Sequence, residues 1–213
     1  MIKKKITIAV CIAGLFIISI AWHLPIKKYN NDLESEATNQ KRPSWSGTFE
    51  VPENVSWRTN IPPKGEPGDK LIISGTIFLP DGKTPAKDVI VYVHHTNNKG
   101  VYPQKGNEEG NGKYHGYLRG WMKTASDGKY EFETIRPAPY YNHEGEPAHI
   151  HYNIEAPGYP EYWLTGLWFS DDPRVNGYKI ERDGGFSNIV TLTKDEKGVL
   201  RGTRNIILQK FKD

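Results

Sequence analysis

The sequence predicts an all-β domain: a two-sheet antiparallel β-sandwich with long functional loops, preceded by one N-terminal apolar helix. Turn-forming glycine (21 residues) and proline (15 residues) are frequent, and so is tyrosine (12 residues), which favours strands. From Lys70 onward, short runs rich in β-branched and aromatic residues alternate with turn residues. No helical period follows the N-terminus, so about eight short strands are expected to pack as a sandwich.

The first 28 residues resemble an export signal. Lys3 to Lys5 precede a largely apolar run from Ile6 to Trp22, and Lys27-Lys28 follow it. A positive segment before such a run is typical of a signal peptide, and Ser19 to Ala21 offer small residues for cleavage. The second pair of lysines favours a retained membrane anchor instead. Both interpretations place the domain outside the cytoplasm, either membrane-anchored or secreted.

Charge and cysteine content argue against two classes of protein. The net charge is +3, but residues 1–28 hold five of the 28 basic residues and no acidic one. The rest of the chain therefore has 23 basic and 25 acidic residues, a net charge of −2, and no nucleic-acid partner is expected. Cys11 is the only cysteine, so the domain is not a disulfide-stapled scaffold.

Residues 29–66 are polar and rich in turn residues, without a sustained hydrophobic period. They are interpreted as a polar linker that becomes an ordered arm near the domain, onto which Trp45, Phe49 and Trp57 would pack. The folded domain is expected over residues 67–213.

Within that domain, strands are expected where alternating or β-branched runs are bounded by turns. They are Leu71–Leu79, Asp88–His95, Tyr117–Thr124, Lys129–Ile135, His149–Glu155, Tyr162–Phe169, Ile189–Leu192 and Arg204–Gln209. The third and fourth are predicted to form a hairpin across Asp127-Gly128. Residues 103–116 and 136–146 are predicted long loops, which often carry function on a β scaffold.

The sharpest chemical signal is His149-Ile150-His151 at the start of a predicted strand. Side chains alternate along a strand, so both imidazoles point to the same face. Two imidazoles presented by a rigid sheet suit one metal ion. From the pair alone, a zinc or copper site with other chemistry and two histidines that are merely at the surface or hydrogen-bonded remain alternatives.

Two tyrosines are candidates to complete such a site. Tyr140 follows Pro137 and Pro139, which stiffen its backbone. Tyr102 closes the predicted turn that begins at Asn97. Any one tyrosine among twelve is usually a core or rim residue, so the case for these two depends on a wider pattern of motifs.

That pattern runs from about Pro67 to Pro173 and consists of the segments 75–82, 89–102, 124–135, 137–140, 147–152 and 164–169. In this order and spacing they resemble the intradiol ring-cleaving catechol dioxygenases, of the protocatechuate 3,4-dioxygenase type. The resemblance implies a β-sandwich that holds non-haem Fe(III) through Tyr102, Tyr140, His149 and His151. Anionic phenolate oxygens are suitable ligands for a hard ferric ion.

The resemblance also implies an activity. Members of this family bind a small aromatic diol and insert O2 between its two hydroxylated carbons, giving a muconate-type dicarboxylate. Tyr102 and Tyr140 would be catalytic residues as well as ligands, and the phenolate at Tyr140 would take a substrate proton. A homo-oligomer is compatible with the resemblance, because protocatechuate-type enzymes build their pockets between related chains.

Two departures from the family pattern concern the pocket over the substrate. Glu146 stands where the family has an arginine, and Gly166 where it has a glutamine. A carboxylate in place of a cation reverses the local field, and losing one preorganised stabiliser costs on the order of 10²–10³ in rate. The alternative function is a catalytically weak or inactive module that binds an aromatic or a glycan at the altered pocket.

Other residues near the motifs are candidates for the pocket. Trp121, Tyr141 and Trp168 would offer flat walls to an aromatic substrate. Arg119 and Arg136 are candidates to replace the cation that Glu146 displaces.

Overall fold

The computed structural model describes residues 47–143, 145–176, 182 and 184–210. The predicted N-terminal helix and residues 29–46 of the predicted linker lie outside these residues, so the export and anchor assignments stay predictions. Within the described ranges, no helix is long and apolar enough to cross a membrane.

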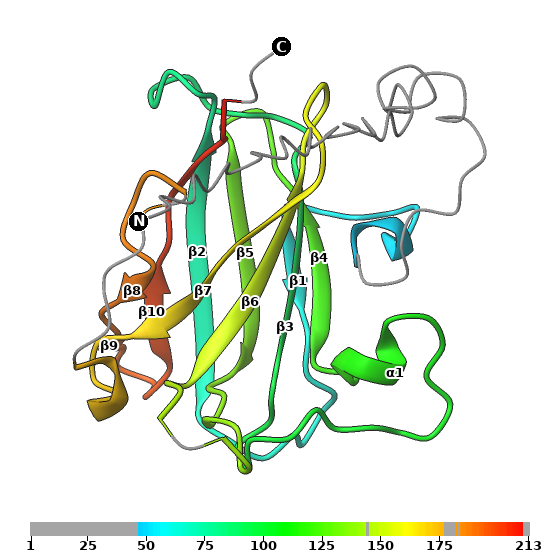
Figure 1. Ribbon diagram of the computed structural model, residues 1–213, viewed down its shortest axis with the longest axis vertical. Coiled ribbons are helices and arrows are strands. Elements are labelled where there is room, and N and C mark those ends of the chain that lie inside the picture. The colour runs from blue at the N-terminus through cyan, green and yellow to red at the C-terminus, as the bar shows by residue number, and fades with distance from the viewer. Residues whose placement is uncertain (1–46, 144, 177–181, 183, 211–213) are drawn as a thin grey trace, which may run out of the picture. The chain divides into compact units, whose positions relative to one another are not determined.

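Two sheets form a sandwich (Figure 1). The six-stranded sheet has the order β1-β5-β2-β10-β9, with β11 also paired to β2, and the five-stranded sheet has the order β4-β3-β6-β7-β8. The strands of the first are β1 (Arg58–Asn60), β2 (Lys70–Phe78), β5 (Lys129–Ile135), β9 (Thr193–Lys194), β10 (Leu200–Thr203) and β11 (Ile206–Ile207). Those of the second are β3 (Ile90–His95), β4 (Arg119–Lys123), β6 (His149–Glu155), β7 (Tyr162–Phe169) and β8 (Ile189–Val190).

Alternation along the strands explains the sandwich. Every second residue of β2 from Leu71 is buried, and Ile150, Tyr152 and Ile154 of β6 belong to the same core. Fully burying one such apolar side chain is worth about 1.5–3 kcal/mol. The odd-numbered residues of β6 therefore face away from the core, and this places His149 and His151 on the outer face of the five-stranded sheet.

The prediction of purely antiparallel sheets is wrong, because both sheets are mixed. The pairs β2–β5, β3–β4, β3–β6 and β6–β7 are antiparallel, but β1–β5, β2–β10, β2–β11 and β7–β8 are parallel. The parallel partners are all strands of two to four residues. Hydrophobic alternation reports which face of a strand is buried but not the direction of its neighbour.

The predicted hairpin across Asp127-Gly128 is also wrong. Its turn does form: Gly128 has φ +71° and its N–H donates to the carbonyl of Ala125 at 2.9 Å. The strands on either side then separate, since β4 pairs with β3 in one sheet and β5 pairs with β2 in the other. Each strand has its own core-facing side, so the connection spans the sandwich instead of folding back within one sheet.

Several short elements lie where the sequence predicts none, among them a strand and a helix. Strand β1 falls within the predicted linker and pairs with β5, so the sheet begins before residue 67. The four-residue helix α1 (Gly112–His115) lies in the long loop between β3 and β4, at the side of the sandwich in Figure 1. Two short 3-10 helices, Thr48–Glu50 and Pro173–Val175, complete the described elements.

Candidate metal centre

Strand β6 presents two imidazoles on the outer face of the five-stranded sheet. His149 is buried (6% exposed) and His151 is partly buried. Their Nε2 atoms lie 3.0 Å apart. The spacing of two along a strand therefore produces the convergence that the sequence predicts.

The loops that carry the two tyrosines are joined by backbone hydrogen bonds. The N–H of Ala138 donates to the carbonyl of Asn97 at 3.0 Å, and the N–H of Tyr141 donates to the carbonyl of Gly100 at 3.3 Å. Gly100 has φ +75°, and a Cβ at this position would lie 2.0 Å from the carbonyl oxygen of Pro139. Only glycine permits this close approach, which brings the Tyr102 loop against the Tyr140 loop.

Four donor atoms meet in one place. The phenol oxygens of Tyr102 and Tyr140 lie 2.7 Å apart, and the oxygen of Tyr140 lies 2.9 Å from Nε2 of His151. With the His149–His151 contact, these distances form a continuous chain of four atoms. Two ligands of one metal ion are at most about 4.2 Å apart when each metal–ligand bond is ~2.1 Å. All three neighbouring separations are below this limit, so each neighbouring pair of donors is close enough to share one ion.

The orientation of His149 also fits a ligand. Its Nδ1 lies 2.8 Å from the carbonyl of Pro147, which only accepts, so Nδ1–H donates and Nε2 carries the lone pair in the neutral ring. Metal-binding histidines usually donate their second N–H in this way. The N–H of Ala148 donates to Oδ2 of Asp172 at 2.8 Å, which anchors the segment before β6.

Burial controls the protonation of these groups. It raises the pKa of Tyr102 far above its ordinary value, and the hydrogen bond with Tyr140 raises it further. Burial also raises the pKa of Tyr140, with a smaller contribution from the Glu146 carboxylate, and lowers the pKa of His151 to about 3. The protein alone thus favours neutral phenols and a neutral His151. A bound trivalent cation favours the phenolates and releases their protons.

Glu146 lies beside the four donors. Its Oε1 is 3.8 Å from Nε2 of His149, and its side chain is 39% exposed. Among the described residues, no group of three or more His, Cys, Asp or Glu side chains is arranged to hold a metal ion. The candidate site described here therefore includes the two phenol oxygens among its donors.

Sequence reasoning missed a layer of aromatic residues around His151. His94 on β3 is the direct cross-strand partner of His151, and the two rings stack with centroids 4.5 Å apart. His115 from α1 stacks on the other side of His94 at 3.7 Å, and the hydroxyl of Tyr92 is 2.7 Å from Nδ1 of His115. Trp163 meets all three imidazoles edge-on. Tyr92 and His94 alternate on one strand, but their position beside His151 depends on a register that the sequence does not reveal.

The pocket candidates lie at different distances from this centre. Strand β7 has one residue more than β6 between the pairs Ile150–Leu167 and Tyr152–Leu164, so Thr165 and Gly166 oppose His151 as a bulge. A Cβ at Gly166 would lie 3.5 Å from Cβ and Cδ2 of His149, so this position borders the donors.

The three aromatic candidates differ in their relation to the donors. Trp168 is the cross-strand partner of His149 on β7. Trp121 donates from Nε1 to the carbonyl of Gly47 at 2.6 Å and packs on Tyr92, one layer away from His151. Tyr141 is 73% exposed and follows Tyr140 on the outside of the loop.

The two arginine candidates are engaged elsewhere. Arg136 forms a bidentate pair with Asp171 at 2.7 and 2.8 Å and lies over the ring of Phe169. Arg119 pairs with Glu50 and lies over the ring of Trp121. The structure therefore does not bring either guanidinium to the donor atoms.

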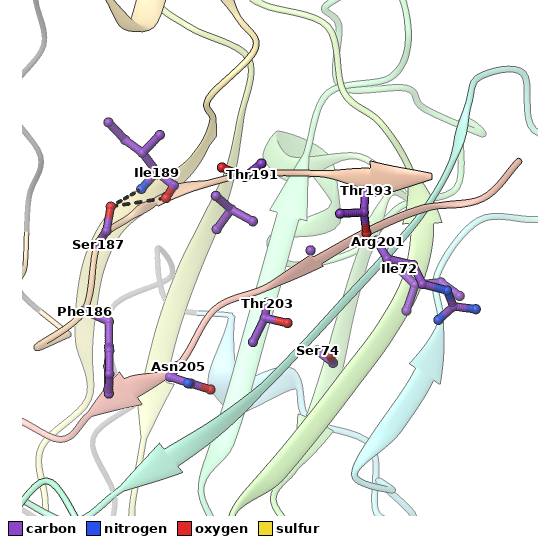
Figure 2. A pocket seen from close by; sticks show the side chains of 12 residues that line it. Ile72, Ser74, Phe186, Ser187, Ile189, Thr191, Thr193, Arg201, Thr203 and Asn205 are labelled. Carbon is purple, nitrogen blue, oxygen red and sulfur yellow. Dashed lines mark hydrogen bonds between the residues drawn. The ribbon is translucent and has the colours of Figure 1, made fainter. Parts of the chain in front are cut away.

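A separate hollow of about 500 Å³ lies on the six-stranded sheet, between β2, β9, β10 and the segment 186–191 (Figure 2). Five of its twelve lining residues carry a hydroxyl, and Arg201 at its edge pairs with Asp195 at 2.9 Å. It shares no residue with the candidate metal centre.

Comparison with known proteins agrees with this fold and identifies a family. A protein-family model described as "Dioxygenase" (Dioxygenase_C) matches residues 52–196, which is more than half of the chain. Chlorocatechol 1,2-dioxygenase from Rhodococcus opacus is 33% identical over 131 residues, covering 52% of this chain and 48% of that protein. The chain spans about half the length of the curated relatives it matches. The chain belongs to the intradiol dioxygenase family.

Solved structures share the fold. The dioxygenase domain of a dioxygenase–carbohydrate-binding protein fusion from Streptomyces sp. SirexAA-E aligns with a TM-score of 0.56 and 24% identity, covering 80% of this chain and 95% of that chain. Catechol 1,2-dioxygenase from Acinetobacter sp. ADP1 aligns with a TM-score of 0.59 and 23% identity, covering 74% and 58%.

Proposed function

We propose that this protein is a non-haem Fe(III) intradiol dioxygenase, which inserts O2 between the two hydroxylated carbons of a catechol to give a muconate-type dicarboxylate. The observation that carries the proposal is the convergence of the Tyr102, Tyr140, His149 and His151 donor atoms at 2.7–3.0 Å. Zinc or copper on the two histidines is less well supported, because two phenol oxygens complete the donor set and suit a hard ferric ion.

The residues of the site have separate tasks. Bound iron would supply the Lewis acidity that activates a catechol ring for reaction with O2. His149 is held in its ligand tautomer by Pro147. The oxygen of Tyr140 contacts both Tyr102 and His151, so a substrate proton held there is within reach of two further acceptors. The stacked imidazoles and Trp163 form an aromatic surface against the donors.

Ring cleavage is tested with the full chain loaded with Fe(III). Oxygen uptake and product spectra are measured with a panel of catechols, including catechol, chlorocatechol and protocatechuate, the compounds in the names of the relatives. The proposal predicts stoichiometric O2 uptake and a ring-opened dicarboxylate with at least one of them. Iron-loaded protein that binds catechols without O2 uptake would contradict the enzymatic proposal.

A second candidate is a weak or inactive module that binds an aromatic or a glycan on the same sandwich. The specific observation in its favour is the Glu146 carboxylate beside His149, where a cation would stabilise negative charge on the ring. Ring cleavage that appears only in a Glu146→Arg variant would favour this candidate. Strong activity of the unmodified protein would reject it.

Export of the domain, by anchor or by cleaved signal peptide, and homo-oligomer formation belong to the same proposal. Membrane fractionation of the full chain tests the first, and light scattering of the purified protein tests the second.

A further inference from the structure

Glu146 is placed by the same short segment that places His149. Pro147 restricts the residue before it to extended backbone. The carbonyl of Pro147 accepts from His149, and Ala148 donates to Asp172. The position of the Glu146 backbone relative to the imidazole is therefore held by two hydrogen bonds and one proline ring.

The contact between Glu146 and His149 is not an ordinary hydrogen bond. The distance of 3.8 Å is too long, and in the neutral ring Nε2 carries a lone pair, so two acceptors face each other. The same distance is below the ~4.2 Å limit for two ligands of one ion. The separation is therefore compatible with a cation that binds both His149 and the carboxylate.

The charge of the site also favours binding of the Glu146 carboxylate to the metal ion. Two phenolates and one carboxylate balance the three positive charges of Fe(III), and oxygen anions are the ligands that hard cations prefer. Within the described residues, Arg119 and Arg136, the two cations considered for this pocket, are paired with Glu50 and Asp171 and do not compete for Glu146. The Glu146 side chain has three rotatable bonds and is 39% exposed, so rotation about these bonds can change the distance between its carboxylate and the donors.

We propose that Glu146 is a fifth protein ligand of the metal, acting as a third anionic oxygen beside Tyr102 and Tyr140. This inference rests on the proposed iron site and deepens it. A carboxylate ligand would occupy a coordination position that exogenous ligands otherwise use. Small anions and catechols would then bind only in competition with Glu146, and the carboxylate would select for ligands able to displace it.

The test compares the full chain with Glu146→Gln and Glu146→Ala, each loaded with Fe(III). Gln keeps the shape and removes the charge, and Ala removes the donor. Glu53→Gln is the matched control, because Glu53 is exposed and far along the chain from the site. Three quantities are measured: the energy of the tyrosinate-to-Fe(III) absorption band, the rate of iron loss to a chelator, and the dissociation constant for azide.

With a carboxylate ligand in the wild type, both Glu146 variants shift the band to lower energy, because the ion becomes a stronger Lewis acid. Iron loss accelerates at least tenfold, since weaker, outer-shell changes already cost roughly 10–100-fold in metal affinity. Azide binds at least tenfold more tightly to Glu146→Ala. Glu53→Gln matches the wild type in all three.

Two results overturn the inference, and they are distinguishable. If the wild type shows the band and the Glu146 variants match it in all three measurements, Glu146 is not a ligand, while the iron site stands. If the wild type itself takes up no Fe(III) and shows no band, the proposed function fails together with the inference.

Discussion

Strands β3 and β6 are antiparallel neighbours. Two histidines lie at the C-terminal end of β3 and two at the N-terminal end of β6, which form the same end of the pair. On β3, His94 and His95 are adjacent and therefore face opposite sides of the sheet. His95 points to the other sheet, where Nδ1 lies 2.8 Å from the carbonyl of Thr96 and Nε2 lies 2.7 Å from Oγ1 of Thr134. On β6, His149 and His151 share one face and direct both Nε2 atoms to the same point.

The difference between the pairs shows what separates a structural histidine from a candidate ligand. Both nitrogens of His95 are occupied by protein partners, so the ring has no lone pair to offer a metal ion. In His149, Nδ1 is hydrogen-bonded to the backbone carbonyl of Pro147, whereas Nε2 lies beside Nε2 of His151, another candidate metal ligand. The spacing of two histidines along a strand determines whether their side chains lie on the same face of the sheet. The neighbouring loops determine whether the Nε2 atom of such a histidine lies near a phenol oxygen.

The largest expected effect comes from breaking the β6 pair. His151→Ala removes the atom that touches both Tyr140 and His149. We expect iron affinity to fall by roughly 100-fold or more, because even outer-shell changes cost about 10–100-fold. Metal analysis after dialysis measures this, with the melting temperature as a check on folding. Full retention of iron by this variant would show that the β6 pair is not a metal site.

Disrupting the contact between the Tyr102 loop and the Tyr140 loop should displace the phenols and leave both histidine pairs in place. Gly100→Ala puts a Cβ 2.0 Å from the carbonyl oxygen of Pro139 at a residue with φ +75°. The backbone must shift, at a cost on the order of 1–3 kcal/mol, and Tyr102 moves away from Tyr140. A weakened tyrosinate absorption band in folded, iron-containing protein is the expected result, because Tyr140 stays beside His151. An unchanged band would mean that the loops position the phenols without this contact.

Removing His95 from the β3 pair should lower the stability of the fold and leave iron binding intact. His95→Ala leaves Thr134 without its partner and opens a cavity in the core, at a cost of about 2–4 kcal/mol in the free energy of unfolding. Iron binding at 25 °C should persist, because His95 contacts none of the four donors. Urea denaturation and metal analysis on the same preparation give both values. Loss of iron from the folded variant would contradict the division of roles.

His95 should also make the free energy of unfolding depend on pH. Burial lowers the pKa of His95 from 6.5 to about 4 in the folded protein. Between these values the unfolded chain binds a proton that the folded chain does not, so stability is complete above pH 6.5 and falls as the pH drops towards 4. The loss at pH 4 is on the order of 3 kcal/mol for this group. Denaturation curves of wild type and His95→Ala should converge as the pH is lowered through this window; a constant difference between them would disprove the linkage.

The sequence predicts the long central strands correctly but not the short strands at the edges of the sheets. The bounds of β5, β6 and β7 match the predicted strands, because each alternates strongly between turn residues. The short strands β1, β9 and β10 were missed, because they are polar and form where another strand offers free backbone groups. The parallel pairings and the separation of β4 from β5 depend on how loops cross the sandwich, which periodicity does not report.

The candidate site shows the same division. His149 and His151 follow from spacing on one strand, whereas Tyr102 and Tyr140 emerge only from the resemblance of ordered motifs. His94 beside His151 depends on strand register and was missed. The proximity of Glu146 to His149 was not predictable either, because it comes from the path of the backbone through Pro147.

The central claim is that two phenols and two imidazoles converge on one ferric ion. The most direct measurement is a titration of the metal-free full chain with Fe(III), followed by visible absorption and by equilibrium dialysis. The account predicts saturation at one ion per chain with a growing tyrosinate-to-Fe(III) band, and loss of that band in a Tyr102→Phe/Tyr140→Phe double variant. A wild-type chain that remains colourless after titration, or equal iron uptake and colour in the double variant, would contradict it.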